Sequence, residues 1–524
     1  MPGRFPQEAS CISKPLRPNV RTGSANHHAA DMLFNSLHFL IFFPVVTALY
    51  FLLPHRFRWM MLLAASCYFY MVFRPVYILI LFFTILVDYV AGILIENSEG
   101  RRRRFYLIAS IGANVGVLAV FKYYNFLNES LRGLLDMAGL ALPVPPLLSI
   151  LLPVGLSFHT FQSLSYTIEV YRGHTPAERH AGIFALYVMF YPQLVAGPIE
   201  RPQNLLWQFR EEHRFEYERV VAGLQLMLWG MFKKVVIADR LAPFVNLVYD
   251  DPRSYTGISL IVATVFFAFQ IYCDFSGYSD IALGSAQVMG FKLMRNFNRP
   301  YFSKSISEFW KRWHISLSTW FRDYLYISLG GNRRTPPRVY FNLFFTFLVS
   351  GLWHGANWTY VVWGALNGFY LIAEIQAQRL TGGNMLRRLT GTVWEWPVRA
   401  VQVGVTFALV CFAWIFFRAN SLADAFYIVT HLFDGFSTLP TDVRSLAFLK
   451  MNVLMRRDKW DFIIAVWAVA LLLVVHFAQR RRGGRETLAR QPAAVRWGLY
   501  YATVIAILFF GAFNESQQFI YFQF

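Results

Sequence analysis

The sequence has few of the residues and none of the short motifs that build common soluble enzyme sites. Its four cysteines are scattered and form no CxxC or Cys/His ligand pattern, namely Cys11, Cys67, Cys273 and Cys411. Neither a disulfide framework nor a zinc site is therefore indicated. No HExxH, Walker-type, GxGxxG or GxSxG motif occurs, which excludes the usual metalloprotease, nucleotide-binding and serine-esterase sites.

Charged residues are also scarce. Only 15% of the 524 residues are charged, whereas 56% are hydrophobic; a soluble domain averages about 25% charged residues. Several apolar runs are long enough to cross a bilayer core of about 30 Å. The runs cover residues 33–53, 76–95, 105–121, 258–271, 398–417, 462–476 and 497–513. They predict an all-α polytopic membrane protein with about 11 to 13 transmembrane or re-entrant segments.

The formal net charge of +19 comes from arginines in short loops between the apolar runs. These clusters are Arg56 with Arg58, residues 101–104, Arg333 with Arg334 and Arg338, Arg387 with Arg388, and residues 480–485. Under the positive-inside rule all of them lie in the cytoplasm, and the chain then enters the membrane from outside at Met32. The charge pattern thus indicates membrane topology and no nucleic-acid partner.

Residues 1–31 do not share this pattern. They are polar and rich in Pro, Ser and Arg, and they contain no apolar core of signal-peptide type. We interpret 1–31 as a non-functional or disordered extension, with Met32 as the alternative start. Residues 32–524 are then expected to form one membrane domain.

Polar residues concentrate between Gln270 and His354. The residues 274–280 include Asp274, Tyr278 and Asp280 and follow directly on an apolar run. Because buried polar groups need partners, we expect this stretch to bend out of the membrane or to face a wet cavity.

A second polar stretch ends at His314. Ser305 followed by Glu308 is a capping-box pattern and predicts the start of a helix. On that helix Trp310 and His314 would lie one turn apart on one face. The alternative is an amphipathic helix at the membrane surface, anchored by Trp and Arg side chains.

His354 stands in an otherwise apolar segment. If a spanning helix enters near Tyr340, a rise of 1.5 Å per residue places His354 about 21 Å along it. An ionisable group at such depth indicates a functional site, and small neighbours such as Gly351, Gly355 and Ala356 allow backbone or substrate to approach. The alternative is a core histidine held by a hydrogen bond.

From Met32 onward the chain resembles the membrane-bound O-acyltransferase superfamily, in the branch of bacterial alginate O-acetylation membrane proteins. Teichoic-acid D-alanyl transfer proteins are similar but more distant. Long matching motifs occur in the expected order, at residues 152–158, 191–199, 270–280, 309–331, 351–358 and 519–524.

The resemblance implies a set of helices around a central tunnel in the bacterial inner membrane. It implies that His354 is catalytic and that His314 is the second signature polar residue, which orients the donor or completes the tunnel. Neutral imidazole can act as the general base for acyl transfer. His159 is assigned no catalytic role.

The same resemblance implies the reactants and partners. The donor is expected to be acetyl-CoA or a similar cytoplasmic thioester, with no tightly bound cofactor and no metal. The acceptor is an extracytoplasmic polysaccharide, alginate or a similar exopolysaccharide, and a separate SGNH-type acetyltransferase or esterase is the expected protein partner.

Two other classes remain open at this point. A transporter or flippase for a lipid-linked or polymeric sugar would also have polar sites at the membrane midplane, although the sequence shows no internal repeat and no paired broken helices. A structural subunit would use its histidines only for packing.

Overall fold

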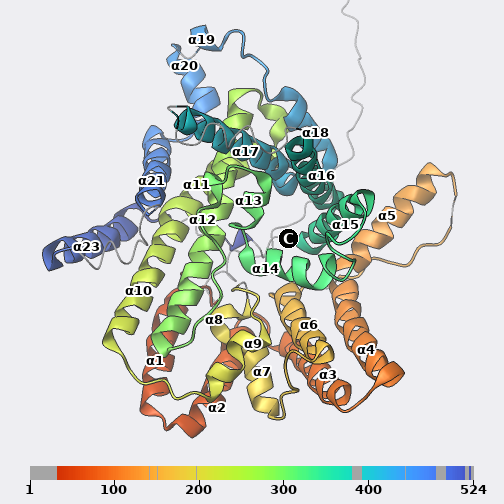
Figure 1. Ribbon diagram of the computed structural model, residues 1–524. Coiled ribbons are helices and arrows are strands. Elements are labelled where there is room, and N and C mark those ends of the chain that lie inside the picture. Colours follow the sequence, from red (N-terminus) through yellow and green to blue (C-terminus); the bar gives the residue numbers. More distant parts are fainter. Residues whose placement is uncertain are drawn as a thin grey trace, which may run out of the picture.

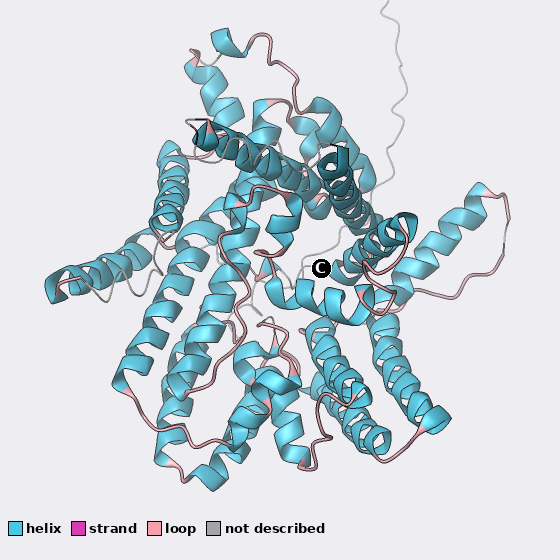
Figure 2. Cartoon of the chain, in the orientation of Figure 1, coloured by secondary structure: helices cyan, strands magenta, loops and turns pink. Residues whose placement is uncertain are grey.

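The computed structural model describes residues 32–140, 142–149, 152–195, 197–380, 392, 394–442, 444–479, 491–513 and 518–520. Within these ranges the regular structure is helical and contains no strand (Figure 2), which confirms the all-α class. The extension 1–31 and the arginine clusters 387–388 and 480–485 lie outside the described residues.

Each predicted apolar run lies wholly or mostly in a helix. Across the described ranges, seven helices are long and apolar enough to cross a membrane, and the apolar α1 (Leu37–Leu52) is shorter. The seven are Pro75–Glu96, Gly100–Met137, Tyr217–Asp250, Ile258–Met289, Glu395–Arg418, Lys459–Ala478 and Ala493–Phe510. The chain is therefore a polytopic helical membrane protein, while the larger number of about 11 to 13 segments, which includes re-entrant ones, stays a prediction.

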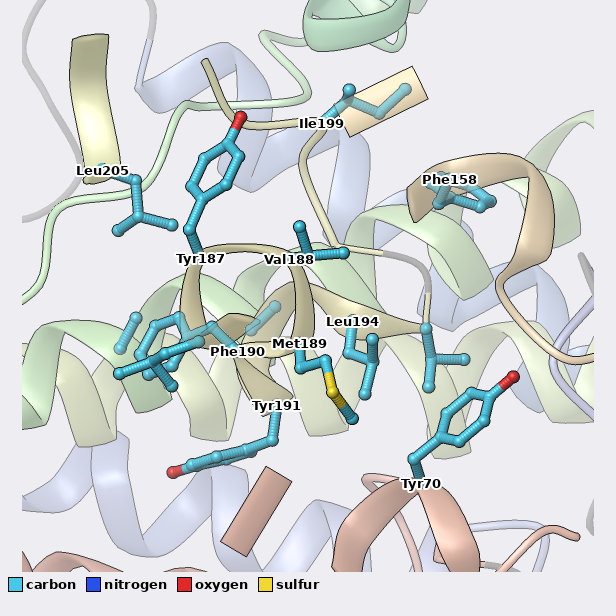
Figure 3. Packing of buried hydrophobic residues seen from close by; sticks show 14 of the residues in the cluster. Tyr70, Phe158, Tyr187, Val188, Met189, Phe190, Tyr191, Leu194, Ile199 and Leu205 are labelled. Carbon is cyan, nitrogen blue, oxygen red and sulfur yellow. The ribbon is translucent and has the colours of Figure 1, made fainter. Parts of the chain in front are cut away.

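Most of the first part of the chain forms the lower half of the molecule in Figure 1. After α1 come α2 (His55–Met71), α3 (Ile78–Glu96), α4 (Gly100–Leu118), α5 (Tyr124–Met137), α6 (Leu156–Arg172), α7 (Ala181–Met189), α8 (Tyr191–Leu194) and α9 (Pro202–Leu205). Helix α7 is apolar on all sides, so it is buried all round. Figure 3 shows its residues Tyr187 to Met189 surrounded by Tyr70, Leu194 and Leu205.

The second part begins with a long interrupted helix. It consists of α10 (Tyr217–Met231), the π-helical turn η4 (Phe232–Ala238) and α11 (Asp239–Asp250), and α12 (Ile258–Met289) packs along it. Helix α12 runs without a break through Asp274 and Asp280, so the expected bend is wrong. Buried lysines of η4 meet these carboxylates instead, since Lys233 Nζ lies 2.9 Å from Asp280 Oδ2 and Lys234 Nζ lies 2.7 Å from Asp274 Oδ1.

Three short helical segments follow, α13 (Ile306–Trp310), α14 (Ile315–Trp320) and the π-helical η7 (Phe321–Tyr326). The predicted cap is confirmed, because Glu308 N donates to Ser305 Oγ at 3.2 Å. The predicted shared face of Trp310 and His314 is wrong, because α13 ends at Trp310. A longer helix would need the backbone groups of Arg312 and Ile315, but these are hydrogen-bonded to the preceding loop. Asn298 N donates to Arg312 O, and Ile315 N donates to Asn296 O, both at 2.9 Å.

The remaining helices complete the upper half of Figure 1. They are α15 (Pro336–His354), α16 (Trp358–Leu380), α17 (Glu395–Arg418), α18 (Leu422–His431), α19 (Leu439–Asp442), α20 (Leu446–Phe448), α21 (Lys459–Ala478) and α23 (Ala493–Phe510). Short turns join the helices, namely η1 (Pro75–Tyr77), η2 (Ala119–Tyr123), η3 (Trp207–Arg210), η5 (Pro252–Ser254), η6 (Pro300–Phe302) and η9 (Leu449–Val453). Helices α19 and α20 lie at the end opposite the arginine-bearing turns α1–α2 and α3–α4, as the predicted topology requires.

Two distant parts of the chain meet on α12 at Tyr278. Its ring stacks on Phe34, with centroids 4.3 Å apart, and on Phe519, with centroids 4.6 Å apart. Next to Phe519, the amide of Ile520 donates to Asp274 Oδ2 at 2.7 Å. Phe34, before α1, and Phe519 and Ile520, after α23, are thus all part of the buried core.

Candidate active site

His354 is the last residue of α15 and is buried, with 5% of its surface exposed. Its Nδ1 donates to the carbonyl oxygen of Ser350 at 2.7 Å. A carbonyl can only accept, so Nδ1 carries the proton and Nε2 carries the lone pair of the neutral ring. The predicted helix around His354 is confirmed, and it begins at Pro336, earlier than Tyr340. That α15 spans the membrane stays a prediction, because α15 is not among the seven apolar spans.

Three aromatic rings enclose the imidazole of His354. The ring centroids lie 4.8 Å away for Trp363, 4.9 Å for Trp353 and 5.5 Å for Phe417, all in edge-to-face arrangements. This arrangement is common between aromatic rings and fixes their mutual orientation. The plane of the His354 ring is therefore set by α15, α16 and α17 together.

The small residues beside His354 let α16 come close. A Cβ on Gly351 would lie 2.3 Å from the backbone oxygen of Tyr360, and one on Gly355 would lie 2.1 Å from the Tyr360 ring. Neither position has room for a side chain. The predicted close approach is thus real, and its partner is the protein's own Tyr360.

Two residues of η2 contact the end of α15 and were not found from the sequence. Lys122 Nζ donates to the carbonyl oxygens of Trp353 at 2.7 Å and His354 at 3.1 Å. The Tyr123 hydroxyl donates to Leu352 O at 2.7 Å. The available signal was Lys122 itself, a cation at the end of an apolar run that the charge rule places away from the cytoplasm.

His314 precedes α14 and adopts a left-handed backbone conformation, with φ of 43°. Its side chain is fully buried among Phe275, Phe158 and Trp353, with ring centroids at 4.6, 6.1 and 6.2 Å. His314 is therefore enclosed by the protein itself, and the depth of its segment relative to the membrane stays a prediction. Because Trp353 contacts both rings, the structure brings His314 and His354 into one site.

A cavity of about 60 Å³ adjoins this site and is called the His354 cavity. Residues 152–158, Lys122, Val195, Trp353 and His354 line it. The segment 152–158 contains the start of α6, so two motifs far apart in the sequence face the same space. A cavity of this size has room for water or a small part of a substrate.

A larger cavity of about 380 Å³ lies beside it and is called the Arg418 cavity. It is lined by Phe121, Lys122, Leu152, Thr359, Tyr360, Arg418, residues 355–357, Ala419 and Asn420. Lys122 and Leu152 line both cavities. The two cavities therefore adjoin at these two residues.

Other candidate groups lie elsewhere. His159 of α6 is buried beside Tyr70, with ring centroids 6.4 Å apart, and it does not line the His354 cavity. Among the described residues, no group of three or more His, Cys, Asp or Glu side chains could hold a metal ion.

Comparison with known families shows which family the sequence around this site matches. The model of the membrane-bound O-acyltransferase family matches residues 180–417, a range that contains His314 and His354. The family was expected from the motifs in the sequence.

Individual relatives cover most of the chain. A probable alginate O-acetylase (AlgI) of Pseudomonas aeruginosa is 39% identical over 467 residues, which are 88% of this chain and 84% of the relative. The protein of the same description from Azotobacter vinelandii is 38% identical over 90% of this chain and 91% of its own. A peptidoglycan O-acetyltransferase of Helicobacter pylori is 33% identical over 76% of this chain and 79% of its own.

Proposed function

This chain belongs to the membrane-bound O-acyltransferase family and is a multi-pass O-acyltransferase of the bacterial inner membrane, and we propose that it moves an acetyl group from a cytoplasmic thioester toward a polysaccharide outside. Because the chain belongs to a family of enzymes, we favour an enzyme over a transporter or a structural subunit. The observation that carries the proposal is the buried His354, whose Nδ1 is bound to Ser350 O while the ring lines a cavity.

The chemistry assigned to His354 is general base catalysis. Nε2 takes the proton of an attacking hydroxyl as its oxygen forms a bond to the thioester carbonyl carbon. The tetrahedral intermediate then expels the thiolate, which takes the proton back from Nε2 to give the free thiol, and the ester remains. Proton transfer by a positioned base contributes typically 10²–10⁴-fold to the rate.

The two ends of the molecule suit the two reactants. The turns bearing Arg56 and residues 101–104 lie at one end, and the positive-inside rule makes this the cytoplasmic side. Arginine-rich loops, including the one with Arg333 and Arg334 that the same rule assigns to this side, attract the phosphates of a coenzyme A thioester. The Arg418 cavity opens beside the α17–α18 turn, which serves the acceptor.

The names of the relatives support a polysaccharide acceptor, since they refer to alginate and peptidoglycan O-acetylation. We propose alginate or a similar exopolysaccharide as the acceptor, with a separate SGNH-type acetyltransferase or esterase completing delivery to the polymer. His314 would orient the donor or complete the tunnel next to Trp353.

The test is the substitution His354→Ala, with acetyl esters and secreted polymer both measured. We expect esters to be lost while polymer secretion continues, because the base is removed and the fold is kept. His431→Ala is the matched control: His431 Nδ1 also donates to the carbonyl four residues earlier, Tyr427 O, at 2.8 Å, but it lines neither cavity. Normal ester content in His354→Ala would refute the assignment.

A further inference from the structure

The end of α15 depends on another helix for its hydrogen bonds. The last carbonyl groups of a helix have no partner within it, and here the carbonyls of Leu352, Trp353 and His354 accept from Tyr123 and Lys122. The three bonds are 2.7 to 3.1 Å long. Every carbonyl from Leu352 to His354 is thus held by side chains of one short segment.

That segment is the π-helical turn η2, Ala119–Tyr123. A π turn closes its hydrogen bonds over five residues and rotates less per residue than an α-helix, so adjacent side chains diverge less. Lys122 and Tyr123 can therefore both reach α15. Single π turns inside α-helices occur frequently at functional sites.

The ammonium group of Lys122 binds the carbonyl end of α15 and not a carboxylate. Among the described residues, no carboxylate forms an ion pair with Lys122. Its ammonium instead lies at the negative end of the α15 dipole, where a cation is stabilised, and 6.0 Å from the Trp353 ring centroid. Lys122 is half-buried and lies within the candidate span Gly100–Met137. An ionisable residue inside a membrane span is costly and indicates a functional position.

We infer that Lys122, together with Tyr123, is a positioning residue that holds His354 in its reactive orientation. The inference rests on the proposed role of His354. The aromatic rings fix the plane of the His354 imidazole, whereas the bonds from Lys122 and Tyr123 hold the backbone of the last turn of α15. The Nδ1 bond to Ser350 O depends on the position of that turn. A misplacement of about 1 Å can lower a rate about 10²-fold.

The experiment measures kcat and KM in membrane vesicles that hold the protein together with its SGNH-type partner, with acetyl-CoA as donor and alginate oligosaccharides as acceptor. In Lys122→Met we expect kcat to fall about 10²-fold while KM for acetyl-CoA stays near that of the wild type. Lys122→Arg, which keeps the charge and donors, recovers part of the loss. Tyr123→Phe, which removes one of the three bonds, gives a smaller loss.

Two controls match these changes. Arg132 Nη2 also donates to two consecutive carbonyls, Val144 O and Pro145 O, and the Tyr124 hydroxyl donates to Pro146 O at 3.1 Å. Both side chains bind the segment 144–146 that follows α5, and neither binds a carbonyl of α15. Arg132→Met and Tyr124→Phe are therefore expected to keep kcat.

The outcomes distinguish a loss of positioning of His354 from a loss of protein stability and from a failure of the proposed function. Thermal unfolding is measured for each variant, and Lys122→Gln, which keeps a donor, replaces Lys122→Met if the latter does not fold. Wild-type kcat in the folded Lys122 variant, or an equal loss in Arg132→Met, overturns the inference. If His354→Ala keeps its activity the proposed function fails; if only Lys122→Met keeps it, the positioning role alone fails.

Discussion

The ring of Trp353 lies 6.2 Å, centroid to centroid, from the ring of His314, while its chain neighbour is His354. Substituting His314 by Gln should therefore disturb the packing of Trp353 and, through it, the reactive site. We predict that His314→Gln lowers ester formation by up to about 10²-fold, the loss expected from a small displacement of catalytic groups. The measurement is ester content per amount of folded membrane protein.

The control for this prediction is another buried histidine. His159→Gln changes a side chain that is also buried but lies beside Tyr70, so ester formation should stay near the wild-type level. If both variants lost activity equally, burial alone would explain the effect, and a special role of His314 would be disproved.

Gly351→Ala should destabilise the contact between α15 and α16. The added Cβ would lie 2.3 Å from Tyr360 O, and overpacking of this kind costs about 1–3 kcal/mol. Gly404→Ala on α17 is the control, because its Cβ would meet nothing within 4 Å and alanine is favoured over glycine in a helix by up to about 1 kcal/mol. Thermal unfolding in detergent should shift downward only for Gly351→Ala; an equal stability of both variants would contradict the packing.

Asp274→Asn should loosen the core where the chain's last described residues dock. Asp274 pairs with Lys234 and accepts from Ile520 N, while Lys234 also pairs with Asp239. Removing one partner of a buried ion pair costs up to about 3–5 kcal/mol, and the remaining Asp239 reduces that cost. The half-exposed pair of Asp461 with Arg240 provides the control, since an exposed pair is worth about 0–1 kcal/mol. Thermal unfolding and protease cleavage near residue 520 test the difference, and similar behaviour of Asp274→Asn and Asp461→Asn would argue against it.

The helices were predictable because their signal is local. Each apolar run carries its own length and hydropathy, so α3, α12 and α17 could be placed from the sequence alone. That His354 is buried in a helix was predictable for a related reason, since an ionisable residue stands out within an apolar segment. The start of α15 at Pro336 was missed, although proline in the first turn after Thr335 is a recognisable signal.

The contacts between elements were not predictable. The residues around His314 look amphipathic in sequence, but Phe158, Phe275 and Trp353 come from three other helices and bury the ring. The pairing of Lys234 with Asp274 depends on the register of α12 against η4. Lys122 was missed because its partners are backbone carbonyls, which leave no residue-specific mark in a sequence.

The stacking of Tyr278 between Phe34 and Phe519 has a consequence for how the protein is made. Translation and membrane insertion proceed from the first helix to the last. Phe34 can therefore stack on Tyr278 only after α12 has been synthesised, and Phe519 can do so only after α23 has been synthesised. Contacts between distant parts of a chain form late because their loop-closure entropy must be met first. The contact between Phe519 and Tyr278 therefore forms only after every helix up to α23 has been made, and a chain interrupted earlier lacks it.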